Sequence, residues 1–337
     1  MNVLLVRTSA LGDIVHALPV LTALRRHLPE ARLAWVVDEA FAPLLAGHAD
    51  LDELLVAPLR RARRRGGRLA GARDVARFLA RLRGFRADVA LDLMGNHKGA
   101  LIARLSGARR RIGLARELRR EGSSALWINA PVAARAEHAV DRGLALAAAL
   151  GVPPAAPDFG PGRLAAARGG AAPAGRYAFV HPGAAWGNKR YPPAAWGAVA
   201  RGLAERSGLA VRVGAAPGEE ALADAVVAAS GGAAARFDAP SLGALCAALA
   251  GARVVLAGDT GALHLARAFG RPLVGVYGPT DPGRHGPWGA SEWTVAKRLP
   301  CSHCHRRMDE AKACLLAVEP PEIVERALAA LAAGGRD

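Results

Sequence analysis

The stretch Val3–His27 reads VLLVRTSALGDIVHALPVLTALRRH. Its beginning, Val3–Arg7, is a short apolar run that predicts a buried strand. From Ile14 onward the apolar residues recur at intervals of three and four, which predicts a helix. Only the turn that ends at Asp13 separates the two elements. A buried strand followed at once by a helix is the repeating unit of a parallel α/β sheet.

The same alternation continues along the chain. In the first half, further apolar runs lie at residues 32–37, 41–46 and 54–56, strands are predicted at 89–93 and 111–114, and helices at 99–105 and 136–150. In the second half, strands are predicted at 177–180, 210–213, 254–257 and 273–277, and helices at 193–206, 219–229, 242–250, 262–269 and 320–333. This pattern predicts an α/β fold with two doubly wound, Rossmann-like halves.

The two halves are separated by a stretch rich in proline and glycine, residues 156–175. Such a composition breaks both helices and strands and is typical of an interdomain linker. We therefore predict an N-terminal domain at 1–155 and a C-terminal domain at 176–318. Open α/β sheets bind ligands outside the carboxyl ends of their strands, so we expect the domains to face each other across a cleft at those ends.

The chain is strongly basic, with a formal charge of +16. Residues 60–86 contain eleven arginines and one acidic residue, Asp74, and a second basic run at 104–120 contains seven arginines. A GC-rich genome would account for part of this arginine content without any function. Aromatic residues make up only 5% and do not interleave with the basic runs, so binding to nucleic acid is poorly supported. An anionic membrane surface or a phosphorylated substrate is better supported.

The sequence predicts a cytoplasmic protein. No stretch approaches the roughly 20 apolar residues that cross a bilayer, and the first residues do not form a signal-peptide pattern. Four cysteines in such a protein argue against a disulfide framework. Cys301, Cys304 and Cys314, with a histidine between them, could hold zinc. Reduced thiols that pack a C-terminal loop are the favoured interpretation, and we expect no metal and no cofactor.

The turn Thr8–Asp13 lacks both the G-x-G-x-x-G pattern of dinucleotide folds and the G-K-S/T of a P-loop. It offers instead one carboxylate, Asp13, at the start of a helix. On spacing alone, Asp13 is either an N-cap that satisfies free helix amides or a proton acceptor at the cleft.

A second strand-to-helix turn, Ala257–His264, has the properties of an anion site. Its glycines let the backbone approach a ligand, and the free amides of the helix that begins at Gly261 favour a diphosphate. Asp259 would repel phosphate and is expected to cap or orient the loop, while Thr260 and the amides bind the diphosphate. His264 either faces the same ligand or is an ordinary buried histidine.

Two more loops in the second half point to a nucleotide. The loop His181–Pro192 carries glycines beside Lys189 and Arg190 in front of a helix, which suits a phosphate. The loop Gly214–Glu220 places a carboxylate after a strand and a glycine turn, a common way to hold ribose hydroxyls. With the Ala257–His264 turn, these loops indicate nucleotide binding by the second half.

Together these motifs resemble the ADP-heptose:lipopolysaccharide heptosyltransferase family, and most closely its first-heptose members. The resemblance covers nearly the whole chain and is carried by T-S-x-x-G-D-x-x-H-x-L-P at Thr8–Pro19, W-V-V-D-E at Trp35–Glu39, K-R-Y-P at Lys189–Pro192, G-D-T-G-x-x-H at Gly258–His264 and V-Y-G-P-T-D-P at Val276–Pro282. It implies a GT-B fold in which the N-terminal domain binds the acceptor and the C-terminal domain binds ADP-heptose. It also implies that the last segment, 319–337, returns to pack on the N-terminal domain.

The resemblance implies an inverting, metal-independent transfer of L-glycero-D-manno-heptose to the Kdo region of a lipid A-linked core, on the cytoplasmic face of the inner membrane. Asp13 would be the general base. The donor would be held by the following residues: Lys189, Glu219, Pro240, Asp259, Thr260, Gly261 and His264. The anionic acceptor would be held by a second set: Arg60, Arg63, Arg64, Lys98 and Arg116.

Three departures from the family pattern leave the acceptor open. Ala184 and Ala185 stand where threonines are usual, and the segment Asp92–Gly99 lacks the glutamine and serine of the D-x-Q-G-x-x-K-S motif. The cysteine set is more like that of second-heptose enzymes, so heptosyltransferase II activity is an alternative. A nucleotide-sugar epimerase of the same fold and a non-catalytic protein that binds nucleotide or lipid are the alternatives from other classes.

Overall fold

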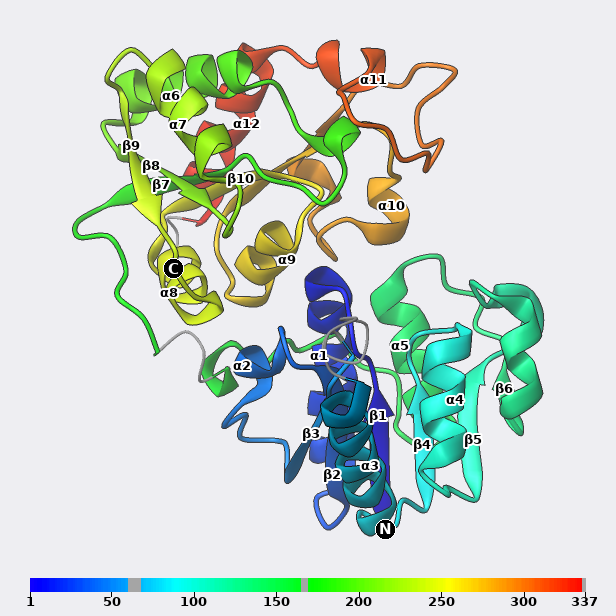
Figure 1. Cartoon of the computed structure of the whole chain (residues 1–337). Coiled ribbons are helices and arrows are strands. Elements are labelled where there is room, and N and C mark those ends of the chain that lie inside the picture. The colour runs from blue at the N-terminus through cyan, green and yellow to red at the C-terminus, as the bar shows by residue number, and fades with distance from the viewer. Residues whose placement is uncertain (60–67, 165–168, 335–337) are drawn as a thin grey trace. The chain divides into compact units, whose positions relative to one another are not determined.

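The computed structural model describes residues 1–59, 68–164 and 169–334. The chain divides into two compact units, 1–165 and 166–337, and the division falls within the expected linker. The predicted pair of doubly wound parallel sheets is confirmed, because each unit contains one six-stranded parallel sheet with interleaved helices (Figure 1).

In the first unit the strand order is β3-β2-β1-β4-β5-β6. The strands are β1 (Asn2–Val6), β2 (Arg32–Asp38), β3 (Glu53–Ala57), β4 (Val89–Asp92), β5 (Arg110–Leu114) and β6 (Ala130–Val132). The helices are α1 (Leu11–His27), α2 (Ala42–Leu45), α3 (Arg68–Gly84), α4 (His97–Leu105) and α5 (Ala139–Ala148), with short 3-10 turns η2 (Arg116–Leu118), η3 (Gly122–Trp127) and η4 (Pro161–Arg163).

Strand β1 lies at the centre of this sheet and is apolar because both of its faces are covered. Leu4 and Val6 pack on one face with Leu82 and Phe85, at the end of α3 and just after it, and with Ile102 of α4. Helices α1 and α5 of the same unit pack against each other. Strand β1 pairs in parallel with both β2 and β4, so the chain order reverses between β1 and β4. This is the switch point at which α/β sheets bind ligands, and both Asp13 and Lys98 follow it.

In the second unit the order is β12-β11-β10-β7-β8-β9. The strands are β7 (Tyr177–His181), β8 (Ala210–Ala215), β9 (Ala234–Asp238), β10 (Val254–Gly258), β11 (Leu273–Tyr277) and β12 (Thr294–Ala296). The helices are α6 (Pro193–Ser207), α7 (Glu220–Ala229), α8 (Leu242–Gly251), α9 (Gly261–Ala268), α10 (Pro282–His285), α11 (Ala313–Leu316) and α12 (Pro320–Gly334), with 3-10 turns η6 (Gly187–Lys189) and η7 (Ser291–Trp293). The switch point lies between β7 and β10.

The final helix, α12, corrects one expectation. It was expected on the N-terminal domain, but it packs within the second unit against α6 and β11 (Figure 1). Ile323, Val324 and Ala327 are buried in the core of that unit together with Trp196 and Leu203 of α6. The apolar face of α12 therefore has its partner in the second unit.

Among the helices of the described residues, none is both long and apolar enough to cross a bilayer.

Candidate active site

Asp13 lies in the first turn of α1, directly beyond the carboxyl end of β1. Ala10 is the N-cap residue, and one carboxylate oxygen of Asp13, Oδ2, accepts a hydrogen bond from the Ala10 amide at 3.1 Å. The other oxygen, Oδ1, lies 2.5 Å from Nη2 of Arg7. Asp13 therefore supports the helix start from its third position, although it is not the N-cap residue itself, and its side chain stays partly exposed.

Arg7 is a site residue that was not predicted from the sequence. Its guanidinium is mostly buried and also donates to the backbone carbonyl of Leu93, which follows β4. The carbonyl of Arg7 accepts from Nε1 of Trp35 on β2 at 2.9 Å. Arg7 thus links the ends of the three neighbouring strands and fixes the orientation of the Asp13 carboxylate. Its place in the turn was visible in the sequence, but nothing in the spacing showed that its side chain folds back to Asp13.

Lys98, an expected acceptor residue, lies beside the same turn. Its Nζ is 3.4 Å from Oγ of Ser9, and it stands in the first turn of α4, whose N-cap is Asn96. The structure therefore brings Lys98 and the Asp13 turn together. Arg116 is exposed on η2 of the same unit. Arg60, Arg63 and Arg64 lie outside the described residues.

A fully buried ion pair supports this region. Nη2 of Arg119 lies 2.5 Å from Oδ2 of Asp92 at the end of β4, and neither side chain is exposed. Nε of Arg119 donates to Oγ of Ser124, and Oδ1 of Asp92 accepts from the amides of Met94 and Gly95 at 3.0 and 3.4 Å. Burial raises the pKa of Asp92, and the Arg119 charge opposes this effect. Arg119 counted as surface charge in the sequence, but it is a structural residue that ties the 116–124 segment to β4.

In the second unit, Asp259 is the centre of a network of side chains. Its Oδ2 lies 2.5 Å from Nζ of Lys189 and accepts from Oγ1 of Thr280 at 2.7 Å. Nε2 of His264 is 3.8 Å from Oδ1. Burial acts to raise the pKa of Asp259, but the His264 hydrogen bond and the Lys189 charge outweigh it, so the pKa lies well below its ordinary value. Asp259 is therefore an ionised anchor for Lys189.

Thr260, His264 and Thr280 lie around Asp259 and differ in their contacts. Thr260 is the N-cap of α9, and its Oγ1 accepts from the Ala262 amide at 3.2 Å. His264 is buried one turn into the same helix. Thr280, which follows β11, was not singled out as a site residue, although it lies in the motif Val276–Pro282. The turn thus presents helix-terminal amides beside a fixed lysine.

Lys189 is held from a second direction by an aromatic ring. Its Nζ lies 4.1 Å from the ring centroid of Trp186, and Cζ of Arg307 lies 4.8 Å from the same centroid. Cation–π contact and the Asp259 carboxylate together fix the ammonium group at the end of β10.

Glu219 lies against the loop that carries Lys189. It is the N-cap residue of α7, and its Oε1 is 3.4 Å from Nη2 of Arg190. A Cβ on Gly183 would lie 1.9 Å from Oε2 of Glu219, so only glycine allows this approach. Burial raises the pKa of Glu219, while the Arg190 charge lowers it. Pro240 is exposed between β9 and α8. The expected donor residues therefore follow four adjacent strands, β10, β7, β8 and β9.

The segment Cys301–Cys314 packs on the loop that carries Lys189. Nδ2 of Asn188 donates to the Arg306 carbonyl at 2.8 Å, and the Asn188 amide donates to the Met308 carbonyl at 2.9 Å. Cys301 and Cys304 are exposed, whereas Cys314 is buried. Among the described residues, no group of three or more histidine, cysteine or acidic side chains is arranged to hold a metal ion. The segment thus braces the Lys189 loop through backbone contacts.

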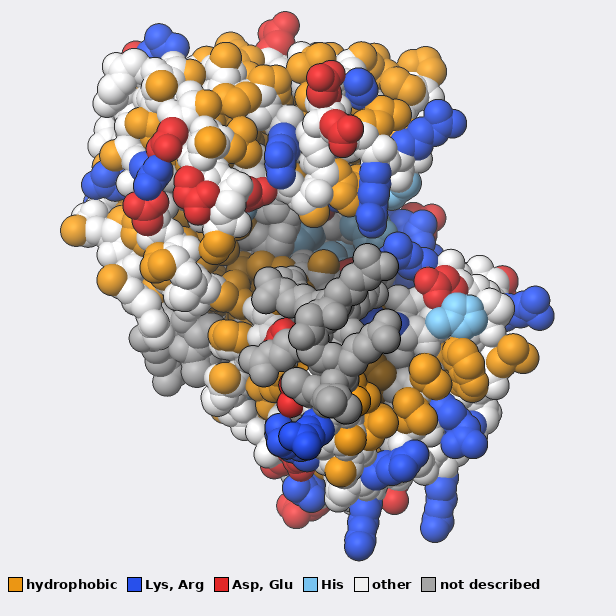
Figure 2. All heavy atoms as spheres, viewed as in Figure 1, with side chains coloured by type: hydrophobic (Ala, Val, Ile, Leu, Met, Phe, Trp, Pro, Cys, Tyr) orange, Lys and Arg blue, Asp and Glu red, His pale blue; other side chains and the backbone are white. Residues whose placement is uncertain are grey.

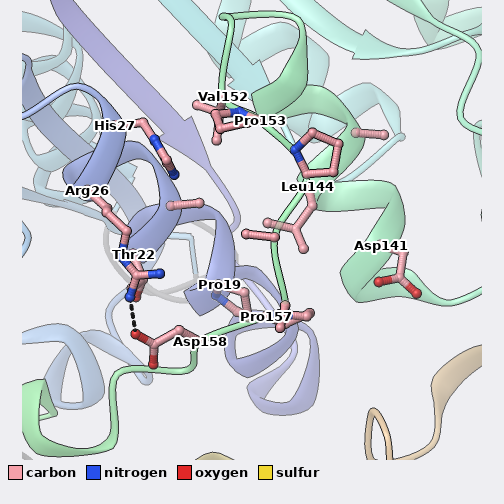
Figure 3. A pocket seen from close by; sticks show the side chains of 15 residues that line it. Pro19, Thr22, Arg26, His27, Asp141, Leu144, Val152, Pro153, Pro157 and Asp158 are labelled. Carbon is pink, nitrogen blue, oxygen red and sulfur yellow. Dashed lines mark hydrogen bonds and ion pairs between the residues drawn. The ribbon is translucent and has the colours of Figure 1, made fainter.

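The first unit contains a cavity of about 250 Å³ (Figure 3). It is lined mainly by apolar groups of α1, α5 and the segment 152–158, including Pro19, Leu144 and Val152. Arg26 and Asp158 form an ion pair of 2.9 Å at its wall. The cavity begins about two helical turns after Asp13, and it contains none of the expected site residues.

The sequence and the fold of the chain are both similar to those of known glycosyltransferases. The profile described as glycosyltransferase family 9 (heptosyltransferase) matches residues 75–315. Lipopolysaccharide heptosyltransferase 1 of Pseudomonas aeruginosa is 34% identical over 311 residues, which cover 91% of this chain and 87% of that protein. The structure of E. coli heptosyltransferase WaaC with ADP-2-deoxy-2-fluoro heptose is 30% identical, with a TM-score of 0.75 over 89% of this chain and 94% of that one.

E. coli ADP-heptose lipopolysaccharide heptosyltransferase II, at 20% identity, shares the fold with a TM-score of 0.77 over 99% of this chain and all of that one. The GT-B class expected from the sequence is therefore confirmed, as is the resemblance to the heptosyltransferases. The chain belongs to glycosyltransferase family 9.

Proposed function

We propose that this glycosyltransferase transfers L-glycero-D-manno-heptose from ADP-heptose to the Kdo region of a lipid A-linked lipopolysaccharide core. The observation that carries the proposal is the carboxylate of Asp13 at the β1–β4 switch point, oriented by Arg7 and flanked by Lys98. It is supported by the relatives named lipopolysaccharide heptosyltransferase 1 and by the WaaC structure with an ADP-heptose analogue.

In the proposed reaction, Asp13 accepts the proton of the acceptor hydroxyl while that oxygen attacks the anomeric carbon of heptose. The bond between this carbon and the diphosphate oxygen breaks, and ADP leaves with the electron pair. A single displacement of this kind inverts the anomeric centre. Because Asp13 is already ion-paired, its carboxylate is held in one orientation before the acceptor arrives.

The charge of the departing diphosphate needs fixed positive groups, and the reaction is proposed to be independent of metal. We assign this task to Lys189, to Thr260 and to the free amides of α9 that begin at Gly261. Asp259 holds Lys189 in place, and His264 lies by the donor phosphates or sugar. In the same proposal, Glu219 binds the ribose hydroxyls and the backbone near Pro240 binds adenine.

The acceptor carries sugar carboxylates and lipid phosphates. Lys98 and Arg116, with Arg60, Arg63 and Arg64, are proposed to bind these anions, for which guanidinium groups are well suited. Since such an acceptor is embedded in a bilayer, the enzyme is proposed to act as a peripheral protein on the cytoplasmic face of the inner membrane.

The direct test is incubation of the purified protein with ADP-heptose and lipopolysaccharides truncated at defined core lengths, followed by mass spectrometry with and without EDTA. One added heptose on a core that ends in Kdo, unaffected by EDTA, is the expected result. Addition only to a core that already carries heptose would indicate heptosyltransferase II activity instead. ADP binding without consumption of ADP-heptose would identify a non-catalytic protein, and conversion of the donor alone would indicate an epimerase.

Replacing Lys189 by Ala is expected to weaken ADP binding about 10- to 100-fold, since a charge-assisted hydrogen bond is worth roughly 1.5–3 kcal/mol. The change also leaves Asp259 without its cation, and the remaining carboxylate repels a diphosphate. Isothermal titration calorimetry with ADP measures the effect. Lys312→Ala, at an exposed lysine 3.9 Å from Glu310, is the matched control and should bind ADP normally. An unchanged ADP affinity in Lys189→Ala would contradict the donor-site assignment.

A further inference from the structure

Two exposed leucines lie close together on the first unit. Leu126, on η3, is 86% exposed, and Leu101, on α4, is 41% exposed. They are half of the four large hydrophobic residues that are exposed in the described part of the chain, the others being Met1 and Leu316. Two such side chains at one place need an explanation, because single exposed hydrophobic residues are ordinary but clusters mark interaction sites.

Helix α4 and the 3-10 turn η3 pack against each other, and Trp127 takes part in this contact. The ring of His97, in the first turn of α4, lies 5.3 Å from the ring of Trp127, and its Nε2 is 2.9 Å from Oγ of Ser123. Leu101 stands one helical turn after His97 on the same face of α4, and Leu126 is adjacent to Trp127 in sequence. Leu101 therefore lies on the face of α4 that meets η3, and η3 carries both Leu126 and the half-buried Trp127.

Arginines border this surface. Arg104 is exposed on the same face of α4, three residues after Leu101. Arg109 is exposed as well, and its carbonyl accepts from Nδ2 of Asn129, two residues after Trp127, at 2.8 Å. Figure 2 shows hydrophobic and basic side chains next to one another over α4 and the segment that leads to β6. We call the surface formed by Leu101, Arg104, Arg109, Leu126 and Trp127 the Leu126 patch.

We propose that the Leu126 patch docks the enzyme on an anionic lipid bilayer. Leucine and tryptophan side chains enter the interfacial region of a bilayer, and flanking arginines attract anionic headgroups. A second copy of this chain fits less well, because it would bring its own arginines against Arg104 and Arg109. The charge of the patch thus favours a lipid surface over self-association.

The position of the patch also matches the proposed acceptor, and this step rests on the proposed function. Lys98 stands in the first turn of α4, and Leu101 lies in the next turn, about 5 Å further along the helix. An acceptor whose lipid part lies in the bilayer would therefore extend its sugars over a short distance to Lys98 and the Asp13 turn.

The test is sedimentation of the full-length protein with large vesicles of phosphatidylcholine alone or with phosphatidylglycerol added. The unaltered protein is expected to bind the anionic vesicles and much less to the neutral ones. The variant Leu101→Ser/Leu126→Ser should lose about tenfold or more in partitioning, because its apolar side chains no longer enter the interface. Arg104→Glu/Arg109→Glu should lose binding to anionic vesicles by a similar factor.

Leu316→Ser is the matched control, because Leu316 is 56% exposed in the second unit, and it should bind vesicles like the unaltered protein. Equal vesicle binding by the double leucine variant would overturn the proposal, as would a concentration-dependent dimer in analytical ultracentrifugation that Leu126→Ser abolishes. Heptose transfer to a deacylated, water-soluble acceptor separates this proposal from the proposed function. It should persist in both patch variants if the enzyme is active, and its absence from the unaltered protein would count against the function alone.

Discussion

Replacing Asp13 by Asn is expected to lower kcat for heptose transfer about 100- to 10,000-fold, the range by which a positioned general base accelerates a reaction. The amide oxygen of Asn can still accept the Ala10 hydrogen bond, so the start of α1 should remain intact. What the variant loses is the ability to take up a proton and the charge that pairs with Arg7. ADP affinity should change by no more than a few-fold, because the donor residues lie in the second unit. Steady-state kinetics and calorimetry measure the two quantities.

Asp141 provides the control for this experiment. Like Asp13, it occupies the third position of a helix in the first unit, here α5 after its N-cap His138. Asp141→Asn removes the same charge from an equivalent helix position and should leave kcat nearly unchanged. Near-normal turnover of Asp13→Asn on a native acceptor would exclude Asp13 as the base.

Replacing Arg119 by Met is expected to destabilise the first unit by about 3–5 kcal/mol, the usual cost of leaving one partner of a buried ion pair alone. The remaining carboxylate of Asp92 would be fully buried without a counter-charge. For a unit of this size the loss corresponds to a fall in Tm of roughly 10 °C. Differential scanning calorimetry would show the shift in the transition of the first unit.

The double variant Arg119→Met/Asp92→Asn tests the cause of that loss. It removes the buried charge but keeps an oxygen to accept from the amides of Met94 and Gly95, so part of the stability should return. Arg120→Met, at the exposed neighbouring arginine, should have almost no effect. A normal Tm in Arg119→Met would show that the ion pair contributes little.

The central strands of both sheets were predictable because they are buried on both faces and read as continuous apolar runs. The edge strands β6, β9 and β12 were not predicted, because they are short or half-exposed and carry few apolar residues. Helix α3 was not predicted either, since it is rich in arginine and presents only a narrow apolar stripe, with Phe78 and Leu82, to the core.

The site was predictable to the extent that its residues follow strands. Asp13, Lys189 and Asp259 stand directly after or near strand ends, where ligands of α/β sheets bind. Their partners were not predictable, because a side-chain pair depends on the order of strands in the sheet. Lys189 and Asp259 are 70 residues apart, and they meet only because β7 lies beside β10. The burial of Arg119 was not predictable for the same reason, because its partner Asp92 is 27 residues away in the sequence.

Asp259 accepts hydrogen bonds from Lys189 and Thr280, which belong to different loops. Lys189 precedes α6 in the loop after β7, and Thr280 follows β11, so one carboxylate joins the loops after three adjacent strands. Because all three loops are held by the same carboxylate, a displacement of one loop also affects the other two. Substitutions at Lys189 and Thr280 should therefore be energetically coupled, and a double-mutant cycle on ADP affinity should deviate from additivity by about 0.5 kcal/mol or more.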